Sequence, residues 1–140
     1  MILLSVDYGD VRTGLAVCDK NEILASPVCV IKDSDRNSLI DKILAVAEER
    51  RAEAFVVGLP KNMDGTEGFR AQACREFAKE LASRSGKEVS LYDERLTTVC
   101  AHQALNMTDT RGKKRKAVVD AVSAVMILED YMAHRRSAAK

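Results

Sequence analysis

The amino-acid sequence predicts an α/β fold in which helices cover a mixed five-stranded sheet. Two short segments are apolar at every position or nearly so, which is typical of strands buried on both faces. After residue 33, segments with helical spacing alternate with strand-like segments, which indicates strands joined by crossover helices. The expected order of elements is β-β-β-α-β-α-β-α-α.

The first three elements are expected to form an antiparallel meander. Residues 2–6 are apolar apart from one serine and end at a charge, so they predict a buried strand. Residues 13–19 are small and apolar, and residues 23–31 follow a polar turn. Because Pro27 has no amide hydrogen, the third strand is expected at an edge of the sheet.

The first helix is expected to begin after residues 33–35, whose side chains offer N-cap oxygens. Apolar residues then recur at helical spacing up to about Arg51. Residues 54–59 are apolar and end at Pro60, so they predict a second doubly buried strand.

A second helix is expected over residues 69–85, with Gly86 as a left-handed stop. Its inner face is expected to carry Ala73, Phe77, Ala78, Leu81 and Ala82. The fifth strand is expected over residues 88–92.

Two further helices are expected after the fifth strand. The first begins at Thr97 or Thr98 and ends near Met107. The second covers about residues 114–134; it contains many valines, but twenty residues without Gly or Pro are too long for a strand. Residues 135–140 are expected to fray.

The composition fits one soluble domain spanning residues 1–140. Of its residues 46% are hydrophobic and 31% are charged, which argues against disorder. The 22 basic and 21 acidic residues leave a net charge of +1, which excludes a histone-like wrapper but permits a local basic patch. We expect a cytoplasmic protein without membrane contact, because neither a leader nor a spanning segment is visible.

The cysteines and histidines give no sign of a metal site or a disulfide. No cysteine lies in a CxxC pair or near a histidine at metal spacing, so reduced, buried thiols are expected. This applies to Cys18, Cys29, Cys74 and Cys100. His102 and His134 are expected on helix surfaces.

Four acidic residues occupy unusual positions. Asp7 follows a buried apolar strand, Asp93 and Glu94 follow another, and Asp120 interrupts the apolar face of the last helix. Taken singly, each has an ordinary explanation as a cap or an ion-pair partner. Because ligands of open α/β sheets bind beyond the carboxyl ends of the strands, the four together indicate a carboxylate site.

Converging carboxylates require a cation, because two of them about 4 Å apart repel by roughly 4 kcal/mol at an effective dielectric near 20. Oxygen ligands without His or Cys favour Mg²⁺ or Mn²⁺, which nucleases use to cleave phosphodiesters. Lys113, Lys114, Arg115 and Lys116, with Arg111 nearby, would neutralise phosphates beside such a site. A solvated helix start is the alternative explanation of this basic run.

Four blocks of sequence closely resemble the YqgF family, also called RuvX. The blocks are residues 6–16, residues 57–66, residues 93–98 and residues 120–124, the last followed by Ile127, Leu128 and Tyr131. They occur in the same order as in the family, and the resemblance extends from Ile2 to about Met132.

The resemblance implies the RNase H-like fold of RuvC-type resolvases. It also implies a catalytic and metal-binding triad of Asp7, Glu94 and Asp120, with Mg²⁺ or Mn²⁺ as cofactor. Asp93 and Arg12 become accessory residues, and Arg12 also a phosphate contact. Further nucleic-acid contacts are expected at Asn62, Arg95, Lys113, Lys114, Arg115 and Lys116, with Asp64 and Thr66 at the rim.

The resemblance further implies a metal-dependent nuclease that processes the 5′ end of pre-16S rRNA during ribosome biogenesis. A Holliday junction resolvase acting on branched DNA is one alternative, and a non-catalytic ribosome-assembly or nucleic-acid binding factor is another. The expected partners are structured RNA, a ribosomal precursor particle or branched DNA, and the protein is expected to be a monomer or homodimer. Asp10 adds a negative charge without an evident role, and Tyr8 is a candidate for stacking on a base.

Overall fold

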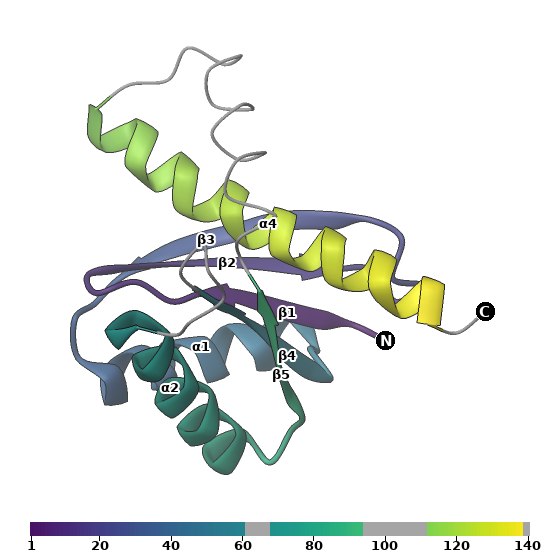
Figure 1. The fold of residues 1–140 in the computed structure, drawn as a ribbon, viewed down its shortest axis with the longest axis horizontal. Helices are drawn as coiled ribbons and strands as arrows, with labels where there is room; N and C mark the ends of the chain where they lie inside the picture. The colour runs from purple at the N-terminus through teal and green to yellow at the C-terminus, as the bar shows by residue number, and fades with distance from the viewer. Residues whose placement is uncertain (61–67, 94–111, 139–140) are drawn as a thin grey trace.

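A computed structural model of the chain describes residues 1–60, 68–93 and 112–138. Its five strands form one mixed sheet in the order β3-β2-β1-β4-β5. Helices α1 and α2 cover one face of this sheet and α4 covers the other (Figure 1). The elements are β1 (Leu3–Asp7), β2 (Arg12–Cys18), β3 (Ala25–Lys32), α1 (Arg36–Arg50), β4 (Ala54–Leu59), α2 (Phe69–Ser85), β5 (Val89–Asp93) and α4 (Gly112–Ala138).

The predicted mixed α/β sheet is confirmed. Strands β1, β2 and β3 are antiparallel neighbours, whereas β4 runs parallel to both β1 and β5. Strand β3 lies at an edge, as Pro27 requires, and the β2–β3 register is irregular between Leu15 and Ala16. Every residue of β4 is buried, as expected for a strand covered on both faces.

The central strand β1 is apolar because both of its faces are covered. Leu4 and Val6 pack in the core cluster beneath α1 and α2, and Leu3 packs in the cluster beneath α4. Ser5 also lies on the α4 face and is fully buried. Its hydroxyl donates a hydrogen bond to the carbonyl of Ala124, with Oγ and O 2.6 Å apart, and so links α4 to β1.

Helix α1 begins and ends close to the expected residues. The Asp35 carboxylate caps it by accepting a hydrogen bond from the Ser38 amide, with Oδ2 and N 3.1 Å apart. Asp33 lies just before the helix and binds Lys42, with Oδ2 and Nζ 2.9 Å apart. Residue Arg51 takes the left-handed conformation that ends the helix.

Helix α2 has the expected bounds, but its buried face is rotated from the predicted one. Gly86 ends the helix at a φ of 69°, as the sequence predicts. Ala71 and Cys74 are buried in place of Ala73 and Ala82, which are only partly covered. Alanine fits a buried or an exposed helix position equally well, so alanine spacing is a weak guide to the inner face.

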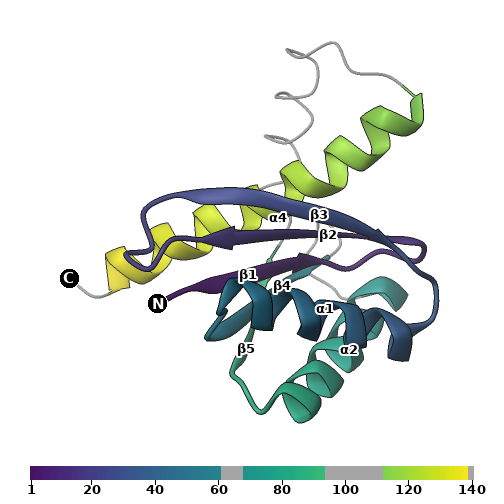
Figure 2. The same ribbon diagram turned by 180° about the vertical axis from the view of Figure 1, so that it is seen from behind.

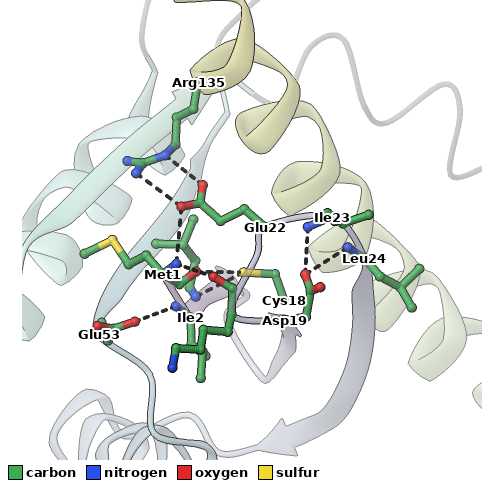
Figure 3. A network of polar contacts seen from close by, with 11 residues as sticks. Met1, Ile2, Cys18, Asp19, Glu22, Ile23, Leu24, Glu53 and Arg135 are labelled. Atoms are coloured by element: carbon green, nitrogen blue, oxygen red, sulfur yellow. Dashed lines mark hydrogen bonds and ion pairs between the residues drawn. The ribbon is translucent and has the colours of Figure 1, made fainter. Parts of the chain in front are cut away.

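Helix α4 extends further than the sequence predicts at both ends. It continues through Ala138, so fraying from residue 135 is wrong for these residues. The reason is visible in Figure 3: the Arg135 guanidinium binds the Glu22 carboxylate, with Nε and Oε1 2.9 Å apart. The α-amino group of Met1 lies 3.6 Å from the other oxygen of Glu22. This end of α4 is therefore tied to the β2–β3 turn.

Other expectations about the chain have mixed outcomes. Cys18 and Cys74 are buried, as expected, whereas Cys29 is only partly buried. His134 is exposed on α4, as expected, with its ring edge against Tyr92. No helix in the described ranges is long and apolar enough to cross a bilayer. The expected helix ending near residue 107, together with Cys100 and His102, lies outside the described residues.

Candidate active site

The candidate site lies where the central strand ends. Asp7 is the last residue of β1 and pairs with Gly14 of β2. On the other side, Val6 pairs with Val57 of β4, so the residue that follows along β4 beside Asp7 is Gly58. Both neighbouring positions on the flanking strands are therefore glycines, which place no side chain of β2 or β4 beside the Asp7 carboxylate.

Asp7 belongs to the sheet face that α4 covers. Side chains alternate along a strand, and Ser5, two residues earlier, binds Ala124 on that face. The helix runs antiparallel to β1, because its far end meets Glu22 beside the start of the strand.

This geometry brings the helix position of Asp120 toward Asp7. Two residues of strand advance about 6.6 Å from Ser5 to Asp7. Four residues of helix advance about 6 Å from Ala124 back to position 120, in the same direction and on the same helix face. The side chain of Asp120 lies outside the described residues.

Of the two predicted acidic residues that follow each other at the end of β5, only Asp93 lies in the described part of the chain. On β5, Leu91 packs against the α1 and α2 side and Tyr92 against the α4 side. The alternation therefore places Asp93 on the face opposite to Asp7. Glu94 lies outside the described residues.

Among the predicted phosphate contacts, Arg12 has a described position. It precedes Thr13 at the start of β2 and shares a sheet face with Gly14, which places it diagonally across from Asp7. Diagonal positions of this kind are about 7–8 Å apart, within reach of a long side chain. Within the described part of the chain Arg12 has no ion-pair partner.

The basic run occupies the first turns of α4, and only its backbone is described. These turns rise away from the sheet on the side where β1 ends, as Figures 1 and 2 show from opposite directions. The positions concerned are Lys113, Lys114, Arg115 and Lys116. The predicted contacts Asn62 and Arg95, with Asp64 and Thr66, lie outside the described residues.

The loop that follows Asp7 is tightly packed. A Cβ atom added at Gly9 would lie 2.1 Å from the carbonyl oxygen of Arg12, so glycine is required there by lack of space. The Gly9 amide donates a hydrogen bond to the hydroxyl of Thr13, which is fully buried. The sequence motif around Asp7 therefore encodes a close turn between β1 and β2.

Arg70 also belongs to this region, although no sequence pattern singles it out. From the first turn of α2 it donates one hydrogen bond to the carbonyl of Tyr8, with Nη2 and O 2.6 Å apart. Its other terminal nitrogen forms an ion pair with Asp10, with Nη1 and Oδ1 2.5 Å apart. The contact gives Asp10 a structural role that sequence inspection did not provide.

Tyr8 is not the open stacking surface that the sequence suggested. Its ring is stacked on Phe77, with centroids 4.2 Å apart and planes 9° apart, and the Arg70 guanidinium lies 5.6 Å from its centroid. Burial raises the pKa of its hydroxyl. Tyr8 therefore belongs to the core beneath α2, on the opposite sheet face from Asp7.

The oxygen chemistry of the site suits a hard divalent cation. Within the described ranges no three His, Cys, Asp or Glu side chains form a metal-binding group. To the candidate cation site, the described part of the chain contributes the Asp7 carboxylate, the glycines beside it and the backbone position of Asp120. Carboxylate oxygens suit Mg²⁺ or Mn²⁺ better than a softer metal.

The sheet order and the acidic residue at the end of the central strand define an RNase H-like fold of the RuvC type. RuvC of T. thermophilus in complex with a Holliday junction substrate matches with a TM-score of 0.63 and 17% sequence identity, over 98% of this chain and 96% of that chain. The Fowlpox virus resolvase in complex with substrate Holliday junction DNA matches with a TM-score of 0.60 and 12% identity, over 96% and 99% of the two chains. The predicted fold class is confirmed.

Residues 1–134 match the family described as RuvX: Holliday junction resolvase, and the chain belongs to this family. A relative from Rhodopirellula baltica is 42% identical over 130 residues, which are 93% of this chain and 75% of the relative. A relative from Lachnospira eligens is 42% identical over 135 residues, 94% of this chain and 96% of the relative. Both relatives carry the name "Putative pre-16S rRNA nuclease".

Proposed function

We propose that residues 1–140 form one nuclease domain that hydrolyses phosphodiester bonds in the precursor of 16S rRNA with the help of a divalent cation. One observation carries the proposal most directly. Asp7 ends the central strand between two glycine positions and faces the helix on which Asp120 lies one turn before Ala124. The family and the names of its members support the same activity.

In this proposal Asp7, Glu94 and Asp120 hold Mg²⁺ or Mn²⁺. When bound, such an ion lowers the pKa of water and stabilises the departing oxygen of a phosphodiester. The chain's own part is to keep the carboxylates in place and to leave space for the substrate. Two carboxylates about 4 Å apart repel by roughly 4 kcal/mol at an effective dielectric near 20, so carboxylates that converge to this extent would favour cation binding.

Substrate binding is assigned to basic groups on two sides of the carboxylates. Arg12 starts β2 beside Asp7, and the basic run of residues 113–116 begins α4. These charges come from two elements at the same end of the strands. They can therefore contact successive phosphates of a nucleic-acid strand that crosses the site. Asn62, Arg95 and the accessory Asp93 would complete the surroundings.

Cleavage of branched DNA is the second candidate function, favoured by the family description and by the two resolvase structures with the same fold. A junction has two equivalent strands to cut, so this reaction calls for a symmetric pair of sites. Trimming of an RNA end requires one site. A non-catalytic binding factor would retain the basic surface and show no turnover.

A side-by-side cleavage assay separates these functions. Precursor rRNA and a four-way DNA junction are incubated with wild type and with Asp7→Asn, in Mg²⁺, in Mn²⁺ and in EDTA. We expect cation-dependent cleavage of the RNA, and a rate lower by more than about 100-fold in the variant because it lacks a ligand charge. Asp41→Asn, a surface change of the same kind on α1, is the matched control.

The outcomes are distinct. Equal cleavage by wild type and Asp7→Asn would refute the proposed site. Preferential cleavage of the junction would assign the protein to the resolvases, and RNA binding in EDTA without products in either cation would assign it to the non-catalytic factors.

A further inference from the structure

We propose that Arg70 is a positioning residue, which fixes the turn after Asp7 and thereby keeps the Asp7 carboxylate in the orientation that binds a divalent cation. The inference rests on the proposed function, and it assigns a role to a side chain outside the carboxylate group. Arg70, the carbonyl of Tyr8 and the carboxylate of Asp10 together are called the Arg70 clamp below.

The Arg70 clamp joins two elements that are about sixty residues apart in sequence. The guanidinium reaches from the first turn of α2 and contacts the turn with both of its terminal nitrogens. Nη2 binds a backbone carbonyl directly after Asp7, and Nη1 binds a carboxylate two residues later. Charge-assisted hydrogen bonds from a planar fork are strong and directional, so the turn is fixed in position and in orientation.

The clamp acts on Asp7 through the backbone. Tyr8 packs on the sheet face covered by α1 and α2, which is also the side from which Arg70 comes. Asp7 belongs to the opposite face, beneath α4, as does Ser5. The peptide bond between Asp7 and Tyr8 is therefore the link between the clamp and the carboxylate, and the Arg70 charge stays on the far side of the sheet.

The other contacts of the turn make it a rigid unit. The Tyr8 ring is stacked on Phe77, which is fully buried in α2. The Gly9 amide binds Thr13, and the space beside Gly9 is too small for a Cβ atom because the Arg12 carbonyl occupies it. A turn so tightly packed transmits a displacement at Tyr8 to its neighbour Asp7. Ligand groups have to be held within about 0.5 Å of their working positions.

Asp10 completes the clamp from the solvent side. Its side chain is 79% exposed, so its pairing with Arg70 adds little stability by itself. The pairing does orient the guanidinium toward the turn and balances its charge. Asp10→Asn keeps the shape of the side chain and removes that charge, so we expect an effect in the same direction as Arg70→Ala and smaller.

Arg84 provides a matched control on the same helix. It lies in the last turn of α2 and also binds one carboxylate and one backbone carbonyl, those of Asp41 and Asn37 on α1. Arg84→Ala therefore removes the same types of interaction from α2 at the end remote from Asp7. A general weakening of helix packing affects both variants alike, whereas a change at Asp7 is specific to Arg70→Ala.

The test measures Mn²⁺ binding to the RNA-free protein by isothermal titration calorimetry. Asp7→Asn identifies the binding that depends on the proposed site. We expect Arg70→Ala to weaken this binding by about 10–100-fold, the range found when supporting groups behind metal ligands are removed. Arg84→Ala is expected to stay within about twofold of wild type. Arg70→Lys retains the charge but not the two-pronged contact, and we expect intermediate affinity.

RNA affinity in EDTA is the second measurement. It should differ by less than about twofold between wild type and Arg70→Ala, because the clamp faces away from the proposed site. Mn²⁺ binding by Arg70→Ala equal to that of wild type, or equally weakened in Arg84→Ala, would overturn the inference. A large loss of RNA affinity in EDTA would also overturn it, since Arg70 would then be a substrate contact. Absence of any Mn²⁺ binding that depends on Asp7 would overturn the proposed function, and this inference with it.

Discussion

Replacing Gly9 by alanine tests whether the close turn after Asp7 controls the site. The added Cβ would lie 2.1 Å from the Arg12 carbonyl oxygen, whereas real Cβ contacts are essentially never shorter than 3.0 Å. The turn therefore has to open by about 0.9 Å. Overpacking of this kind costs about 1–3 kcal/mol of stability. A displacement near 1 Å beside a reacting group can reduce a rate by about 100-fold.

Gly86→Ala is an informative comparison, because that glycine is required for a different reason. Gly86 has a φ of 69° and nothing within 4 Å of an added Cβ. Alanine there is strained by roughly 1–2 kcal/mol without any collision, and the position is at the remote end of α2. The two variants should lose similar stability, and only Gly9→Ala should lose activity.

The assay combines urea denaturation with single-turnover cleavage of precursor RNA at saturating Mn²⁺. Under conditions in which all three proteins are folded, we expect Gly9→Ala to cleave about 100-fold more slowly than Gly86→Ala and wild type. If Gly9→Ala cleaved at the wild-type rate while remaining folded, the turn would not control the site.

Two further predictions concern the free energy of unfolding. Ser5→Ala leaves the carbonyl of Ala124 without its buried donor and should lower the free energy of unfolding by about 1–3 kcal/mol in urea denaturation; an unchanged value would show that the bond does not hold α4. Hydrogen bonding from Ser38 and then Lys42 lowers the pKa of Asp33 to about 2, below the value of about 3.9 in an unfolded chain. The stability that Asp33 adds is therefore present above about pH 4 and lost as the pH falls toward 2. The difference in free energy of unfolding between wild type and Asp33→Asn, measured by urea denaturation, should disappear over that interval.

Features with a local physical cause could be predicted from the sequence. Pro27 lacks an amide hydrogen and so indicated an edge strand, and Gly86 follows an amphipathic run and so indicated a helix end. Asp7 indicated a functional site because a charge directly after a buried strand is costly to bury unless it is paired or binds a ligand. Each of these signals depends on a residue and its immediate neighbours.

Features that depend on distant partners could not be predicted. The pair of Asp10 and Arg70 joins residues 60 positions apart, and either residue alone resembles an ordinary surface charge. The last turns of α4 are ordered by Arg135 and Glu22, which are 113 positions apart. No local pattern distinguishes such residues from those of a frayed end.

The two faces of the sheet are completed at different times during synthesis. Both α1 and α2 precede β5 in the chain, so the cluster beneath them can close as soon as the last strand emerges. The opposite cluster, which includes Leu3 and Val56, needs Ala124, Ile127 and further residues of α4. At about 5–20 residues per second, a nascent chain exposes that apolar face for several seconds after its strands are made. During this interval the growing chain is vulnerable to association with other unfinished chains, and shielding by a chaperone has its greatest value.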